Sequence, residues 1–181
     1  NREILLELRL IADVGLLGLP NAGKSTLISN ITNSKSKIGN YAFTTLDPEL
    51  GVMENERKKI TIADLPGIIE GASQGLGLGT KFLKHAYRTK FLLHLVDGTQ
   101  TTQDALKSFD IIEKELADFH LDFSHQKRWI CITKTDLIDQ KSLSELILEF
   151  QTKYPSTAIY PISSISGDGL DILSEELFKQ I

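Results

Sequence analysis

The residues from Gly18 to Ser25 have the types and spacing needed to hold a chain of phosphates. They read Gly-Leu-Pro-Asn-Ala-Gly-Lys-Ser, which matches the pattern G-x-x-x-x-G-K-[ST]. Glycines let backbone N–H groups turn inward around phosphate oxygens, and the N-terminus of a following helix adds partial positive charge. Lys24 would neutralise the outer phosphates, and the Ser25 hydroxyl is a ligand for Mg²⁺. The motif predicts a nucleoside triphosphate site formed by Gly18, Leu19, Pro20, Asn21, Ala22, Gly23, Lys24, Ser25 and Thr26.

A second candidate motif, Asp64-Leu65-Pro66-Gly67, follows a predicted strand. The Asp64 carboxylate could hold Mg²⁺ through a water molecule, while the Gly67 N–H reaches the terminal phosphate. A bare D-x-x-G pattern is common at average composition, so it indicates little alone. Its position after a strand, downstream of the phosphate motif, favours the functional interpretation.

The nucleotide base is predicted to meet Thr133-Lys134-Thr135-Asp136, after the strand Trp129–Ile132. A carboxylate at Asp136 can accept from both N1–H and the 2-amino group of guanine, and adenine offers neither donor. Adenine would leave the carboxylate unpaired, at a cost on the order of several kcal/mol. The Lys134 stem would lie along the base, and a backbone N–H from Ser163-Ser164-Ile165 could meet guanine O6. Taken separately, the two segments could also be a charged helix start and an ordinary turn.

The elements around these motifs predict an α/β fold. Short apolar runs alternate with segments of helical period, as in a mostly parallel sheet with helices on both faces. We predict six strands in a mixed sheet, with an antiparallel pair joined by the charged turn Glu54–Lys58. The strands centre on Val14–Leu17, Gly51–Met53, Lys59–Ala63, Phe91–Val96, Trp129–Ile132 and Ala158–Ile162. The motifs fall at strand ends, where open α/β sheets bind ligands.

Three predicted helices carry apolar stripes at spacings of three and four, which are typical of core packing. Ser142 and Glu145 predict a capping box at the start of the second helix, and Asp168-Gly169 precedes the third. The stripes are Leu106, Phe109, Ile112, Leu116 and Phe119; Leu143, Leu146, Ile147 and Phe150; and Leu170, Leu173, Leu177 and Phe178.

Composition indicates one globular domain. The chain has 181 residues, a net charge of −4 and 41% hydrophobic residues. Its single cysteine, Cys131, excludes a disulfide framework within the chain, and no apolar run has membrane-spanning length. We therefore expect a cytoplasmic monomer without a membrane span or a leading signal peptide. The first residue is Asn1 rather than Met, so the chain is interpreted as a piece of a longer protein.

Three segments together resemble the GTPase domain of the Obg family. They are Ala12–Thr26, Tyr41–Leu46 and Ile62–Ser73, the last of which opens a long glycine-rich stretch. The resemblance implies a Ras-like, three-layer P-loop domain over residues 12–181, with 1–11 a connector from an absent glycine-rich N-terminal domain. It also implies GTP and GDP as ligands, Mg²⁺ as cofactor, and the large ribosomal subunit as partner in assembly or stress response.

The resemblance further makes residues 35–48 and 64–90 two switches ordered by Mg²⁺ and the γ-phosphate. It implies Thr45 as a Mg²⁺ ligand, with Thr44 the less favoured choice. The nucleotide contacts that it adds are Phe43, Thr44, Thr45, Leu46, Leu65 and Pro66. Thr133 stands where the family has Asn, and Ser164 where it has Ala. A threonine can still bond the phosphate loop, so we expect guanine selection to survive with weaker affinity.

Hydrolysis is expected to be slow, because Ile68 occupies the position where many GTPases carry a water-orienting Gln. Relatives with Asn at the Asn21 position bind K⁺ against the phosphates, which predicts K⁺ stimulation; alternatively, Asn21 only caps the turn. The predicted catalytic residues are Lys24, Asn21, Thr45 and Gly67. A non-hydrolysing binding module is the main alternative. A kinase using ATP would need an acceptor pocket and a lid, and neither is evident.

A basic cluster near the second predicted switch permits two interpretations. Such a cluster is commonly a solvated face, but it could also contact ribosomal RNA phosphates. Its members are Lys81, Lys84, His85, Arg88 and Lys90.

Overall fold

The computed structural model describes residues 11–32, 37–38, 49–65, 83, 85–118, 122–123 and 126–181, without the side chains of 37–38. Its strands are β1 (Ala12–Leu17), β2 (Lys37–Ile38), β3 (Glu49–Glu54), β4 (Lys59–Asp64), β5 (Thr89–Asp97), β6 (Lys127–Thr133) and β7 (Ile159–Pro161). Its α-helices are α1 (Lys24–Ile31), α3 (Thr102–Asp118), α4 (Gln140–Lys153) and α5 (Leu170–Gln180), and a 3₁₀ helix covers Thr135–Leu137.

The strands form one mixed sheet in the order β2-β3-β4-β1-β5-β6-β7. The pairs β2–β3 and β3–β4 are antiparallel, and every other pair is parallel. The predicted α/β sheet is confirmed, including the antiparallel pair around the charged turn. Strand β2 is a seventh, unpredicted strand at the edge of the sheet. Its two residues are too few to show an alternating hydrophobic pattern in the sequence.

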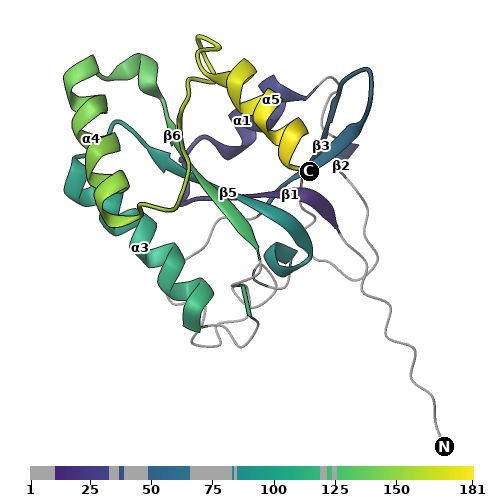
Figure 1. Cartoon of the computed structure of the whole chain (residues 1–181), viewed down its shortest axis with the longest axis horizontal. Coiled ribbons are helices and arrows are strands. Elements are labelled where there is room, and N and C mark those ends of the chain that lie inside the picture. The colour runs from purple at the N-terminus through teal and green to yellow at the C-terminus, as the bar shows by residue number, and fades with distance from the viewer. Residues whose placement is uncertain are drawn as a thin grey trace, which may run out of the picture.

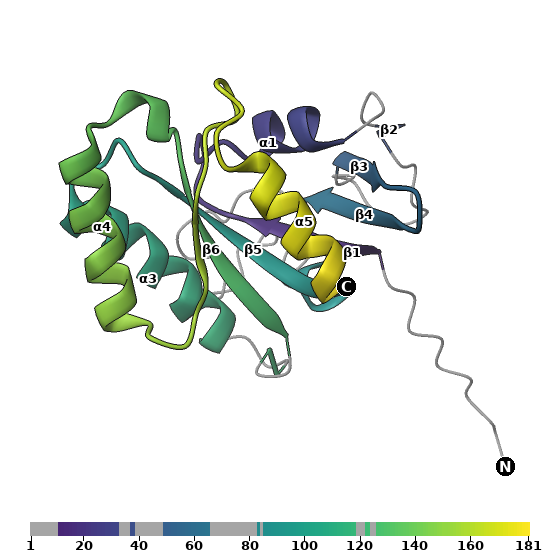
Figure 2. The same ribbon diagram turned by 45° about the horizontal axis from the view of Figure 1, so that its top comes forward.

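Helices cover both faces of the sheet (Figures 1 and 2), with α1 and α5 on one face and α3 and α4 on the other. Leu27 and Ile28 of α1 share a buried cluster with Leu173 and Leu177 of α5. On the opposite face, Phe109 of α3 belongs to a cluster with residues of α4 and β6. The three predicted layers are therefore present, and the predicted stripes face the core except for Phe119, which lies outside the described residues.

Helix α4 begins earlier than its sequence signal suggested. Asp139 is the N-cap, and its carboxylate accepts from the backbone N–H groups of Lys141 and Ser142, both at 2.9 Å. The predicted capping box at Ser142 and Glu145 is wrong, because an aspartate three residues earlier satisfies the same orphan donors. Among the described helices, none combines the length and the apolar character needed to cross a bilayer.

The parallel strands direct their carboxyl ends to one edge of the sheet. The segments that leave this edge begin at Gly18 after β1, Leu65 after β4, Gly98 after β5, Lys134 after β6 and Ile162 after β7. This edge gathers residues from distant parts of the chain, and it is where such sheets bind ligands.

Candidate nucleotide-binding site

The turn from β1 into α1 has a backbone that few side chains tolerate. Gly18 has φ 156° and Gly23 has φ 93°; a Cβ on Gly18 would lie 2.9 Å from Leu95 O. Asn21 adopts the left-handed region at φ 65°, which asparagine tolerates better than most residues. Gly23 is the N-cap of α1, without a side-chain hydrogen bond, and the first turn holds no acidic residue. The N-terminus of α1 is thus available to an anion.

Lys24 folds back over this loop. Its Nζ donates to Gly18 O at 3.0 Å and to Leu19 O at 3.2 Å, and the residue is only 8% exposed. Burial lowers the pKa of Lys24, while the nearby Asp64 carboxylate acts in the opposite direction. The ammonium is therefore held at the loop by two carbonyl oxygens, which phosphate oxygens can replace as stronger partners.

Ser25 and Asp64 meet beside the loop. Asp64 ends β4 opposite Leu16 of β1, and its Oδ2 accepts a 2.5 Å hydrogen bond from Ser25 Oγ. Its other oxygen, Oδ1, is buried and has no hydrogen-bond partner within the described part of the chain. Burial raises the pKa of Asp64, and the Ser25 hydrogen bond and the Lys24 charge counteract it. The Ser25 hydroxyl and the Asp64 carboxylate, whose Oδ1 has no partner among the described residues, form a hard-oxygen donor set that fits Mg²⁺.

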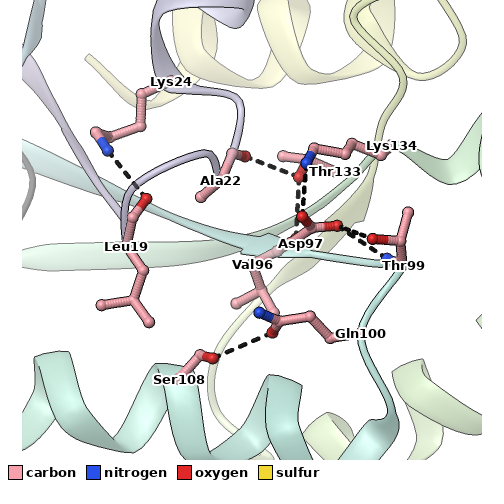
Figure 3. A network of polar contacts seen from close by, with 10 residues as sticks. All are labelled: Leu19, Ala22, Lys24, Val96, Asp97, Thr99, Gln100, Ser108, Thr133 and Lys134. Atoms are coloured by element: carbon pink, nitrogen blue, oxygen red, sulfur yellow. Dashed lines mark hydrogen bonds and ion pairs between the residues drawn. The ribbon is translucent and has the colours of Figure 1, made fainter.

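Thr133 joins the end of β6 to the phosphate loop (Figure 3). Its Oγ1 lies 2.9 Å from Ala22 O and 3.1 Å from Val96 O, and the residue is buried. The prediction that a threonine here can bond the phosphate loop is confirmed. The predicted base-binding segment and the predicted phosphate loop are therefore neighbours.

Lys134 follows in the left-handed conformation, at φ 59°. Its Nζ donates to Asp97 Oδ2 at 2.6 Å, a contact that Figure 3 shows beside Thr133. Sequence reasoning missed Asp97, the last residue of β5. A single acid after a strand has no diagnostic spacing, so only its register opposite Thr133 in the sheet could have indicated this contact.

Asp136, in the 3₁₀ helix after β6, contacts Ser163, which follows β7. Ser163 Oγ donates to Asp136 Oδ1 at 2.6 Å and accepts from the N–H groups of Ile165 (3.2 Å) and Ser166 (3.0 Å). Asp136 itself is exposed. Ser163 therefore fixes the carboxylate through its side chain, a role the sequence did not indicate. Among the described hydrogen bonds none uses the N–H of Ser164, which leaves it as the backbone donor of this turn.

The remaining predicted residues divide into two groups. Thr26 is exposed in the first turn of α1, Leu65 is buried after Asp64, and the Thr135 N–H donates to Ile162 O at 3.3 Å. The other predicted site residues lie outside the described residues: Phe43, Thr44, Thr45, Leu46, Pro66 and Gly67, with Ile68 beside them.

A family model described as "50S ribosome-binding GTPase" matches residues 13–134, a span that includes the phosphate loop, Asp64 and Lys134. The chain belongs to this GTPase family. Curated relatives named "GTPase Obg" include those of Ruthia magnifica subsp. Calyptogena magnifica, 46% identical, and Elusimicrobium minutum, 44% identical. The matches cover 99% and 98% of this chain but 54% and 38% of the relatives, so the chain spans about half of their length or less.

These relatives identify the chain as an Obg-family G domain, as its sequence motifs predicted. Among solved structures, a variant of Era from Aquifex aeolicus bound to GDP and AlF₄⁻ matches with a TM-score of 0.73 at 27% identity. That match covers 93% of this chain and 56% of the Era chain. The fold of this chain therefore agrees with the GTPase family to which its sequence belongs.

Proposed function

We propose that this G domain binds GTP and GDP with Mg²⁺ and slowly hydrolyses GTP to GDP and phosphate, as a molecular switch. The observation that carries the proposal is the hydrogen bond from Thr133 Oγ1 to Ala22 O. This hydrogen bond joins the predicted phosphate loop to the predicted base-binding segment, so one nucleotide can contact both. We take 12–181 as the G domain and 1–11 as its connector.

In the proposed complex, Lys24 exchanges its two carbonyl partners for oxygens of the outer phosphates. Ser25 and Asp64 hold Mg²⁺, with Asp64 acting through water, and Thr45 is the proposed further ligand. Bound Mg²⁺ draws charge from the phosphate oxygens. The N-terminus of α1 and the Gly67 N–H bind further phosphate oxygens. We also propose nucleotide contacts for Phe43, Thr44, Leu46 and Pro66, on the family resemblance.

Guanine is recognised by Asp136, which accepts from its N1–H and 2-amino groups. The hydrogen bond from Ser163 holds the carboxylate in place before the base arrives. The Ser164 N–H is the proposed donor to guanine O6, since the N–H groups of Ile165 and Ser166 are already bonded. The Lys134 stem lies along the base. Adenine has neither donor, so an adenine nucleotide would cover the Asp136 carboxylate without giving it a hydrogen bond from the base, which disfavours adenine.

Hydrolysis is slow in this proposal because Ile68 has no group that can orient water. Single-turnover release of phosphate from GTP tests it, with ATP as the control nucleotide. Release from GTP with a first-order rate that Lys24→Ala abolishes supports a GTPase. GTP binding without release over many hours supports the alternative, a non-hydrolysing module controlled by guanine nucleotides.

Asn21 is the proposed source of K⁺ sensitivity. It is exposed at the bend of the phosphate loop, and its backbone is left-handed at φ 65°. A cation held there would offset charge that develops on the phosphates. A role limited to shaping the turn predicts no difference between K⁺ and Na⁺.

The proposed partner of the full-length protein is the large ribosomal subunit, in the cytoplasm, with the G domain acting as a monomer. The family name supports the ribosome association. The proposed basic cluster supports it less, because His85 is buried and Lys90 pairs with Asp13 at 2.8 Å. Pelleting the full-length protein with large subunits tests the association, with a GTP analogue or GDP bound. Equal pelleting in both states would contradict a switch.

A further inference from the structure

Asp97 is placed to control Lys134, although no sequence motif includes it. It ends β5 in register with Thr133, and the Gly98 N–H donates to Thr133 O at 2.9 Å. A Cβ on Gly98 would lie 2.7 Å from that same oxygen, so the two backbone segments are too close to admit a side chain at position 98. The start of the 133–136 segment is therefore fixed against the end of β5.

Both carboxylate oxygens of Asp97 are engaged in fixed directions (Figure 3). Oδ1 accepts from the N–H of Thr99 at 2.9 Å and from its hydroxyl at 2.7 Å. Oδ2 accepts from Lys134 Nζ at 2.6 Å. Burial alone would raise the pKa of Asp97, but the hydrogen bonds from Lys134 and Thr99 lower it below its ordinary value. The carboxylate thus presents a negative charge to Lys134 from a rigid turn.

The Lys134 side chain is long, so the contact with Asp97 decides how well it is ordered. A lysine side chain has four rotatable bonds, and ordering it costs up to about 2 kcal/mol when nothing holds its end. The contact with Asp97 fixes the ammonium, and the left-handed backbone fixes the other end of the stem. The aliphatic part between these two points is then pre-ordered as a flat apolar surface.

We propose that Asp97 is a positioning residue for the purine base: it holds Lys134 so that the stem is ready to pack on guanine. This inference rests on the proposed function and deepens it, because it adds a base-orienting residue to the site. Asp97 does not touch the nucleotide; its effect passes through Lys134.

The test is a double-mutant cycle with Asp97→Asn and Lys134→Met. Asp97→Asn keeps an acceptor for Thr99 but removes the charge, and Lys134→Met removes the ammonium but keeps an apolar stem. Titration calorimetry with GDP and Mg²⁺ gives each Kd. We expect Asp97→Asn to raise the Kd about ten-fold in the wild-type background and less than about two-fold in the Lys134→Met background. In GTP turnover, KM should rise by the same factor while kcat stays unchanged, since base packing is equal in ground and transition states.

Asp110→Asn is the matched control, because Asp110 makes a similar pair with Lys153 between α3 and α4, at 2.5 Å. It should leave the GDP Kd unchanged. Equal losses from Asp97→Asn in both backgrounds, or a fall in kcat instead of a rise in KM, would overturn the positioning role. An unchanged Kd in Asp97→Asn would do the same. Failure of the wild-type domain to bind GDP would instead contradict the proposed function itself.

Discussion

Thr133 is the most informative position to mutate, because one hydroxyl hydrogen faces two carbonyl oxygens. Thr133→Val removes that donor from Ala22 O and Val96 O, at 2.9 and 3.1 Å, at a site that is 2% exposed. A buried acceptor that loses its partner costs ~1–3 kcal/mol. Because the loop can relax toward water, we expect the unfolding free energy to fall by about 1–2 kcal/mol.

The same change should weaken nucleotide binding. A relaxed loop must re-form around the phosphates, so part of the loss appears in the GDP Kd, as a rise of up to about ten-fold. Thr133→Asn should act in the opposite direction, because a carboxamide offers two N–H donors to the two carbonyls. One additional neutral hydrogen bond contributes about 1 kcal/mol, which is about five-fold in Kd.

Urea unfolding of the nucleotide-free domain and calorimetry with GDP and Mg²⁺ measure these two quantities. Thr152→Val is the control, since Thr152 is exposed and donates to Leu148 O at 2.8 Å within α4. It should change neither quantity. The reasoning is refuted if Thr133→Val stays within about 0.5 kcal/mol of wild type in unfolding free energy, the range of a neutral surface change, with an unaltered GDP Kd.

Three other predictions concern the base, the loop and the core. Asp136→Asn should move nucleotide preference from guanine toward xanthine, measured by competition of GDP and XDP; unchanged preference would exclude Asp136 as the base reader. GTP hydrolysis should be faster in KCl than in NaCl, and Asn21→Ala should remove the difference; equal rates in wild type would end that proposal. His94 of β5 is buried against Phe109 of α3, and burial lowers its pKa. The unfolding free energy should therefore be greatest above pH 6.5 and fall as pH decreases below it, by at most about 1.4 kcal/mol per pH unit. His94→Gln should flatten this pH dependence, measured by denaturant titration at several pH values. A wild-type unfolding free energy that does not fall below pH 6.5 would contradict the role given to His94.

Sequence reasoning succeeded where short-range spacing carries the information. The phosphate loop needs glycines and a lysine at fixed positions, so Gly18, Gly23 and Lys24 could be recognised directly. The central parallel strands β1, β5 and β6 were predicted because their apolar runs are buried on both faces. The hydrogen bond from Thr133 to the phosphate loop followed from the family position of that residue.

Contacts set by sheet register could not be predicted in the same way. Asp97 meets Lys134 only because β5 and β6 are neighbours with Asp97 opposite Thr133. Ser163 reaches Asp136 because β7 is the next strand along. The start of α4 was misassigned because Asp139, outside the apolar stripe, provides a cap that competes with Ser142.

Selective recognition of guanine is tested most directly by calorimetry of the wild-type domain with GDP and with ADP, both in Mg²⁺. Loss of two charge-assisted hydrogen bonds to Asp136 predicts binding of GDP at least about a hundred-fold tighter than ADP. Equal dissociation constants for the two nucleotides would contradict it.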